Sequence, residues 1–136
     1  MRDGLDVFHL AIPAGDLDEA RHFYVTQLGC KLARTYADRI TVDFFGDQLV
    51  CHLSDLSLQP GDDELLLYPR HFGVTFRRPE DFDALYDLAV LRKVPFFQDI
   101  ATRFDGLAEV HRTFVLKDPS RNLLEFKCYR DPRMMY

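Results

Sequence analysis

Three histidines and one glutamate stand at matching places in strand-like segments. They are His9 in VFHLAIP, His52 in QLVCHLS, His71 in HFGVTFR and Glu125 in NLLEFKCY. Imidazole and carboxylate groups together suit a divalent cation such as Fe²⁺, Ni²⁺, Co²⁺, Mn²⁺ or Zn²⁺, with positions left open for water or substrate. The residue types therefore predict a divalent metal site on His9, His71 and Glu125, with His52 as the candidate fourth ligand.

The alternation of side chains along each segment explains how the four residues could meet. Successive side chains on a strand point to opposite faces, and in all four segments the bulky apolar residues occupy the face that lacks the His or Glu. If a helix covers each apolar set, the four polar residues line the other, concave face. Pairing of equivalent strands would then set His9 opposite His71 and His52 opposite Glu125. A single histidine on a strand is more often a surface or core residue than a ligand, so the prediction rests on the matched set.

The elements that carry these residues follow one plan twice. In the first half, a strand at 7–13 precedes a helix at 15–29, with Asp16 as its N-cap and Gly29 at its end, and three strand-like runs follow. In the second half, a strand at 71–77 precedes a helix at 79–93 and three more strands. We expect an α+β fold of two βαβββ modules, 1–58 and 69–130, joined by a polar linker. The modules should form a curved, barrel-like mixed sheet with the helices on its convex side.

Composition narrows the possible partners. The 136 residues are 47% hydrophobic with a net charge of −5, which is typical of a globular protein and offers no basic surface for nucleic acid. No run approaches 18 apolar residues and the start lacks a signal-peptide pattern, so the expectation is a cytoplasmic protein without a membrane span. The three cysteines have neither disulfide nor zinc spacing, and we expect reduced core residues.

Three segments together resemble a known family. They are FHLAIPAGDLDEARHFYVTQLGCKLAR at 8–34, RHFGVTF at 70–76 and DPSRNLLEFK at 118–127, the last being similar to a D-P-x-G-N-x-x-E segment. The chain resembles the vicinal oxygen chelate superfamily, which includes glyoxalase I, extradiol dioxygenases, methylmalonyl-CoA epimerase, fosfomycin-resistance thiol transferases and metal-free bleomycin-binding proteins. The resemblance implies one glyoxalase/dioxygenase-like domain over 1–136, usually a homodimer, with a metal at the positions of His9, His71 and Glu125.

The sequence departs from the family pattern at three positions. His52 stands where glyoxalase I commonly has Glu and the epimerases Gln, so the set of three His and one Glu carries one fewer negative charge than two His and two Glu. Arg121 replaces the usual turn Gly, so either Asn122 takes the left-handed conformation or the turn differs. Val115 occupies the place where a dioxygenase should have Tyr, which disfavours that activity.

Three functions remain open at this point. The favoured one is a glyoxalase-like lyase or isomerase in which the metal chelates vicinal oxygens of a small substrate and Glu125, a ligand carboxylate, transfers a proton. The first alternative is an Fe²⁺ extradiol-type dioxygenase on the same ligands, which would require Fe²⁺ and oxygen. The second is a non-catalytic protein that binds an antibiotic-like small molecule. His111 and Thr113 are candidates for the substrate pocket.

Overall fold

The computed structural model describes residues 3–55 and 65–136. Two compact units, Met1–Asp63 and Glu64–Tyr136, divide the chain, and each is described by itself. Most of the polar linker predicted between the two modules lies outside the described residues. The boundary between the units falls within that predicted linker.

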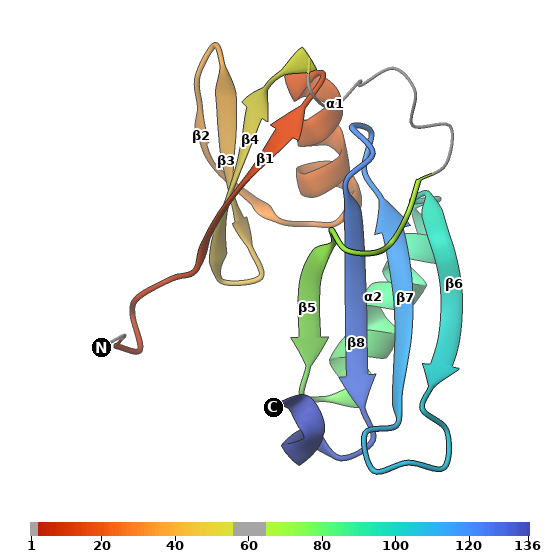
Figure 1. Cartoon of the computed structure of the whole chain (residues 1–136). Coiled ribbons are helices and arrows are strands. Elements are labelled where there is room, and N and C mark those ends of the chain that lie inside the picture. The colour runs from red at the N-terminus through yellow and green to blue at the C-terminus, as the bar shows by residue number, and fades with distance from the viewer. Residues whose placement is uncertain (1–2, 56–64) are drawn as a thin grey trace. The chain divides into compact units, whose positions relative to one another are not determined.

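The first unit is a four-stranded mixed sheet with one helical segment against it (Figure 1). Its elements are β1 (His9–Ala14), α1 (Leu17–Arg21), η1 (His22–Gln27), β2 (Lys31–Thr35), β3 (Arg39–Phe44) and β4 (Asp47–Leu53). The strand order is β1-β4-β3-β2, with β1 parallel to β4 and the other neighbours antiparallel.

Capping and packing explain the helical segment of the first unit. The Asp16 carboxylate accepts from the amides of Asp18 at 2.8 Å and Glu19 at 2.9 Å, which confirms the predicted N-cap. The helix continues beyond Arg21 as a π-helix, which the spacing of apolar residues does not reveal. Phe23 and Tyr24 are fully buried and contact each other edge to face, with ring centroids 4.9 Å apart.

The second unit repeats the same plan (Figure 1). Its elements are β5 (Phe72–Phe76), α2 (Pro79–Leu91), β6 (Phe96–Arg103), β7 (His111–Lys117), β8 (Leu123–Tyr129) and the short 3-10 helix η3 (Pro132–Met135). The strand order is β5-β8-β7-β6, with β5 parallel to β8. The predicted α+β class and the βαβββ plan of each half are confirmed.

Aromatic side chains form the core between α2 and one face of the second sheet. Phe82 of α2 packs against Phe114 of β7 at 5.1 Å between ring centroids, and Phe114 stacks on Phe126 of β8 at 5.3 Å. All three side chains are completely buried, and each such burial stabilises the fold by about 1.5–3 kcal/mol. Because neighbouring strand residues point to opposite faces, Thr113 and Glu125 are directed to the face away from α2.

Several smaller expectations can be compared with the structure. Cys30, Cys51 and Cys128 are all buried and free, as predicted. Arg121 itself adopts the left-handed conformation, with φ of 67°, in the turn before β8. Among the described residues, no helix is long and apolar enough to cross a membrane.

Candidate metal centre

Glu125 is a buried carboxylate with one hydroxyl and two nitrogen groups around it. It lies in β8 and is 7% exposed. The Thr113 hydroxyl donates to Oε1 at 2.9 Å, while Oε2 lies 3.1 Å from His71 Nε2 and 3.1 Å from Lys127 Nζ. A buried charge of this kind is tolerated only when it is paired and hydrogen bonded. The site therefore has one oxygen fixed by a neutral donor and one oxygen facing two nitrogen atoms.

The orientation of His71 is fixed by a backbone carbonyl. Nδ1 of His71 lies 2.9 Å from the carbonyl oxygen of Leu67. Leu67 is anchored in turn, since it packs with Val115 and Leu123 in a small buried apolar cluster. A carbonyl oxygen can only accept, so Nδ1 carries the proton and donates. Nε2, on the Glu125 side of the ring, is then the nitrogen available for a cation.

The backbones of β5 and β8 lie very close to each other beside Glu125. Gly73 and Glu125 are register partners in the parallel pair. A Cβ at position 73 would lie 2.7 Å from the carbonyl carbon of Glu125 and 3.0 Å from its amide nitrogen, which is too close for an unshifted strand. Glycine thus permits this approach of the strand that follows His71.

In the first unit, the structure places Gln48 rather than His52 beside His9. His9 pairs in register with Gln48, and His9 Nδ1 lies 2.5 Å from Gln48 Oε1. His52 is the register partner of Pro13 in β1 and of Arg39 in β3. His52 is four positions after Gln48 in β4, which corresponds to about 13 Å along a strand. His52 and His9 are therefore on the same sheet face but are not neighbours.

Two polar residues that contact the candidate ligands, Gln48 and Lys127, were not predicted from the sequence. Gln48 shares the parity of His52, so alternation alone could have suggested either residue as the neighbour of His9. Lys127 is two residues after Glu125 and thus on the same face, which was a usable signal. Within residues 3–55 and 65–136, no group of three or more His, Cys, Asp or Glu is close enough together to hold a metal. Each unit instead brings together a pair, His9 with Gln48 and His71 with Glu125.

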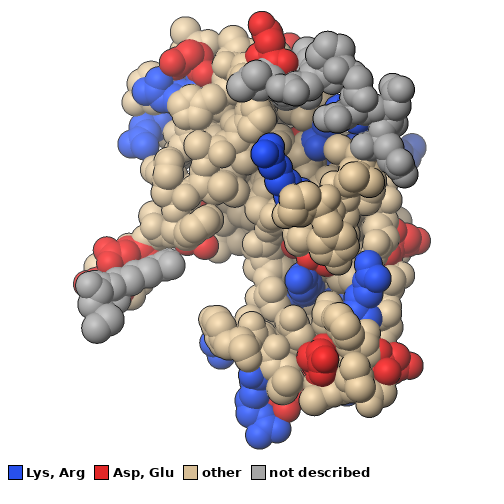
Figure 2. Space-filling model, in the orientation of Figure 1, with Lys and Arg blue, Asp and Glu red and all other residues tan. Residues whose placement is uncertain are grey.

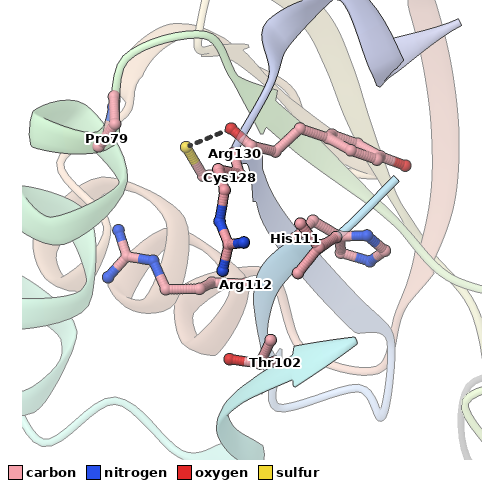
Figure 3. A pocket seen from close by; sticks show the side chains of 8 residues that line it. Pro79, Thr102, His111, Arg112, Cys128 and Arg130 are labelled. Carbon is pink, nitrogen blue, oxygen red and sulfur yellow. Dashed lines mark hydrogen bonds between the residues drawn. The ribbon is translucent and has the colours of Figure 1, made fainter. Parts of the chain in front are cut away.

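His111 lines a cavity where β7 begins and β8 ends. The cavity has a volume of about 290 Å³ and is lined by Pro79, Thr102, Val110, His111, Arg112, Cys128, Tyr129 and Arg130, most of which Figure 3 labels. His111 Nδ1 lies 2.9 Å from the carbonyl oxygen of Glu109, so Nδ1 is the donor in this contact. The Thr113 side chain is absent from the lining and binds Glu125 instead.

Charged groups shape the same cavity. Arg112 donates to Asp83 at 2.9 Å and lies over the Phe82 ring. Burial raises the pKa of the Cys128 thiol, and Arg112 opposes that shift.

Figure 2 shows acidic and basic side chains interspersed over the visible face of the second unit, without a large patch of one charge.

Comparisons with known proteins were consistent in fold. A solved glyoxalase/bleomycin resistance protein/dioxygenase from Alicyclobacillus acidocaldarius is 66% identical, with a TM-score of 0.92 and 100% of both chains covered. The fosfomycin resistance protein FosX from Listeria monocytogenes is 15% identical, with a TM-score of 0.68 and 94% of each chain covered. Lactoylglutathione lyase from Agrobacterium tumefaciens is 15% identical, with a TM-score of 0.67 and coverage of 90% of this chain and 92% of that one. At this level of identity the last two show the fold alone.

The family model gives the decisive match. No curated protein showed significant similarity to the chain. The model of the Glyoxalase/Bleomycin resistance protein/Dioxygenase superfamily, however, matches residues 6–126, which include both pairs of polar residues described above. The chain therefore belongs to the Glyoxalase/Bleomycin resistance protein/Dioxygenase superfamily.

Proposed function

We propose that this protein is a metal-dependent, glyoxalase-like enzyme in which His71 and Glu125 hold a divalent cation. A small substrate would chelate that cation through two neighbouring oxygens. The observation that carries the proposal is the contact of His71 Nε2 with Glu125 Oε2 at 3.1 Å. With Nδ1 donating to Leu67, a neutral His71 presents a lone pair to a carboxylate oxygen. Two acceptors at this distance repel each other unless a metal ion or a proton lies between them.

The distance also fits a shared metal ion. A divalent cation would lie about 2.0–2.2 Å from an imidazole nitrogen and from a carboxylate oxygen, so His71 Nε2 and Glu125 Oε2, 3.1 Å apart, could both reach one ion. Metal-binding histidines commonly donate their other ring N–H to a carbonyl, as His71 does to Leu67. The donor set of one imidazole and one carboxylate therefore suits Fe²⁺, Ni²⁺, Co²⁺, Mn²⁺ or Zn²⁺.

His9 is the proposed ligand from the first unit. If its Nδ1 donates to Gln48 Oε1, Nε2 is left with a lone pair, in the same arrangement as His71. Gln48 would then orient His9 without holding the ion. His52, about 13 Å further along β4, is tested as a separate candidate for the fourth position.

Thr113 and Glu125 would have separate roles in the reaction. A bound divalent cation would act as a Lewis acid on the substrate oxygens. Thr113 holds Glu125 Oε1, so Oε2 is the oxygen free to exchange partners and to take a proton from substrate carbon. Val115 is the register partner of Glu125 and is completely buried, so this position offers no phenol for a dioxygenase.

A metal-free binding protein is the second candidate, and one observation favours it. If His71 is protonated, then Thr113, His71 and Lys127 together satisfy both oxygens of Glu125 without a metal. The same geometry therefore serves either an imidazolium or a metal ion. Metal analysis separates the two.

The test is metal content and affinity in wild type and histidine variants. Purified protein is loaded with Co²⁺, Mn²⁺ or Zn²⁺, dialysed and analysed, alongside His71→Ala, His9→Ala and His52→Ala. His22, exposed on η1, gives the matched control His22→Ala. Loss of affinity of about 100-fold or more in His71→Ala, with none in His22→Ala, is expected from removal of a metal ligand.

The outcomes distinguish the candidate functions. Wild type that retains no more metal than His71→Ala would refute the enzyme proposal and leave the binding protein. If metal binds, a glutathione hemithioacetal is offered as a glyoxalase substrate, and catechols with Fe²⁺ and oxygen as dioxygenase substrates. Turnover only of catechols would contradict the lyase or isomerase assignment.

A further inference from the structure

Lys127 pairs with the carboxylate that the proposed metal would use. It lies in β8 two residues after Glu125, on the same face, with Nζ 3.1 Å from Oε2. Its register partners are Thr75 in β5 and Thr113 in β7, so it stands on a central strand rather than at the sheet edge. The Lys127 side chain is 29% exposed, against 7% for Glu125, so the ammonium has access to solvent where the carboxylate has little.

Oε2 of Glu125 cannot pair with a divalent ion and with the Lys127 ammonium at the same time. Oε2 faces both His71 Nε2 and Lys127 Nζ at 3.1 Å, while Oε1 is already held by Thr113. A divalent ion at Oε2 would meet the Lys127 ammonium at close range, and the two like charges repel. Among the residues that the structure describes, Glu125 is the acidic group that pairs with Lys127. An ammonium displaced from it has access to solvent and is available to pair with a new anion.

We propose that Lys127 and the metal are alternative partners of Glu125 Oε2, and that the displaced Lys127 binds an anionic group of the substrate. This inference rests on the proposed function. The substrate class is a small molecule with two vicinal oxygens for the metal and a carboxylate, phosphonate or similar anion beside them. Lys127 is then a specificity-determining residue, because it lies on the face that carries Glu125 and its flexible stem lets the ammonium reach the substrate there.

The first test measures Co²⁺ affinity, without substrate or turnover. Lys127→Met keeps the length of the side chain and removes the charge, and Lys127→Gln is a second neutral variant. Lys117 in β7 is exposed and gives the matched control Lys117→Met. Because the competing cation is gone, we expect Co²⁺ to bind at least tenfold more tightly to both neutral variants. Lys127→Arg and Lys117→Met should bind it as wild type does.

The second test compares two chelators that share a hydroxamate. Acetohydroxamate supplies two neighbouring oxygens, and phosphonoacetohydroxamate supplies the same oxygens and an anionic group. Co²⁺-loaded wild type should bind the phosphonate at least tenfold more tightly than acetohydroxamate, and Lys127→Met and Lys127→Gln should lose this preference. Circular dichroism is used to check that each variant is folded.

Failure of the inference differs from failure of the proposed function. If Co²⁺ binds wild type and both neutral variants equally, or if the phosphonate preference survives in them, the inference is overturned while the metal site stands. If Co²⁺ binds none of the proteins, the metal site and the inference both fall.

Discussion

Thr113 supplies the only neutral donor among the three partners of Glu125 in the described structure. We predict that Thr113→Val destabilises the protein without creating a cavity, because valine has nearly the same shape. The hydroxyl is completely buried and donates at 2.9 Å to a carboxylate that is 7% exposed. Loss of the donor leaves Oε1 in a place where water has little access.

The size of the effect follows from the charge of the acceptor. Hydrogen bonds to charged groups contribute about 1.5–3 kcal/mol, so the free energy of unfolding should fall by about 2 kcal/mol. With a urea m-value of about 2 kcal/mol/M, the midpoint should fall by about 1 M. Metal affinity should also fall, by about 10–100-fold, because Thr113 orients the ligand carboxylate.

The assay is urea unfolding of metal-free protein at pH 7, with Thr41→Val as the matched control. Thr41 is a strand threonine of β3 that is 4% exposed, so it matches Thr113 in residue type, local structure and burial. Its replacement should shift the midpoint little. The change is then repeated in a Glu125→Met background, where Thr113→Val should cost little because the acceptor is gone.

Two results would refute this reasoning. The first is equal stability loss in Thr113→Val and Thr41→Val, which would mean that the hydroxyl of Thr113 contributes no more than a generic buried threonine. The second is an undiminished cost of Thr113→Val in the Glu125→Met background. Either result would show that Thr113 does not act through Glu125.

Two further predictions concern buried groups outside the site. Asp118→Ala should lower the unfolding free energy by about 2–4 kcal/mol, because Asp118 is 3% exposed and accepts from the amides of Ser120 and Asn122 and from the Asn122 side chain; an unchanged urea midpoint would contradict this. Burial raises the pKa of the Cys30 thiol from 9.0 to about 12. The folded state therefore holds this proton more tightly, and stability should fall as pH rises from 9 toward 12. Cys30→Ala should show a shallower fall, and equal slopes would count against the shift.

The sequence alone determined the features that depend on local pattern. Alternation of apolar residues placed Phe126 under a helix and Glu125 on the other face, because a strand has a side-chain period of two. The Asp16 cap and the repeated βαβββ plan followed from equally local signals. For the same reason, side-chain parity by itself assigns His71 and Glu125 to the sheet face that lies away from the helix.

Tertiary structure decided which members of each face meet. Period two fixes parity but not register, so the sequence could not choose between Gln48 and His52 as the neighbour of His9. The ladder between β1 and β4 makes that choice. The carbonyl that fixes the His71 ring likewise comes from a segment placed by packing against Val115, and no spacing rule predicts such a contact. Local periodicity thus located the candidate ligands, while register and packing set their partners.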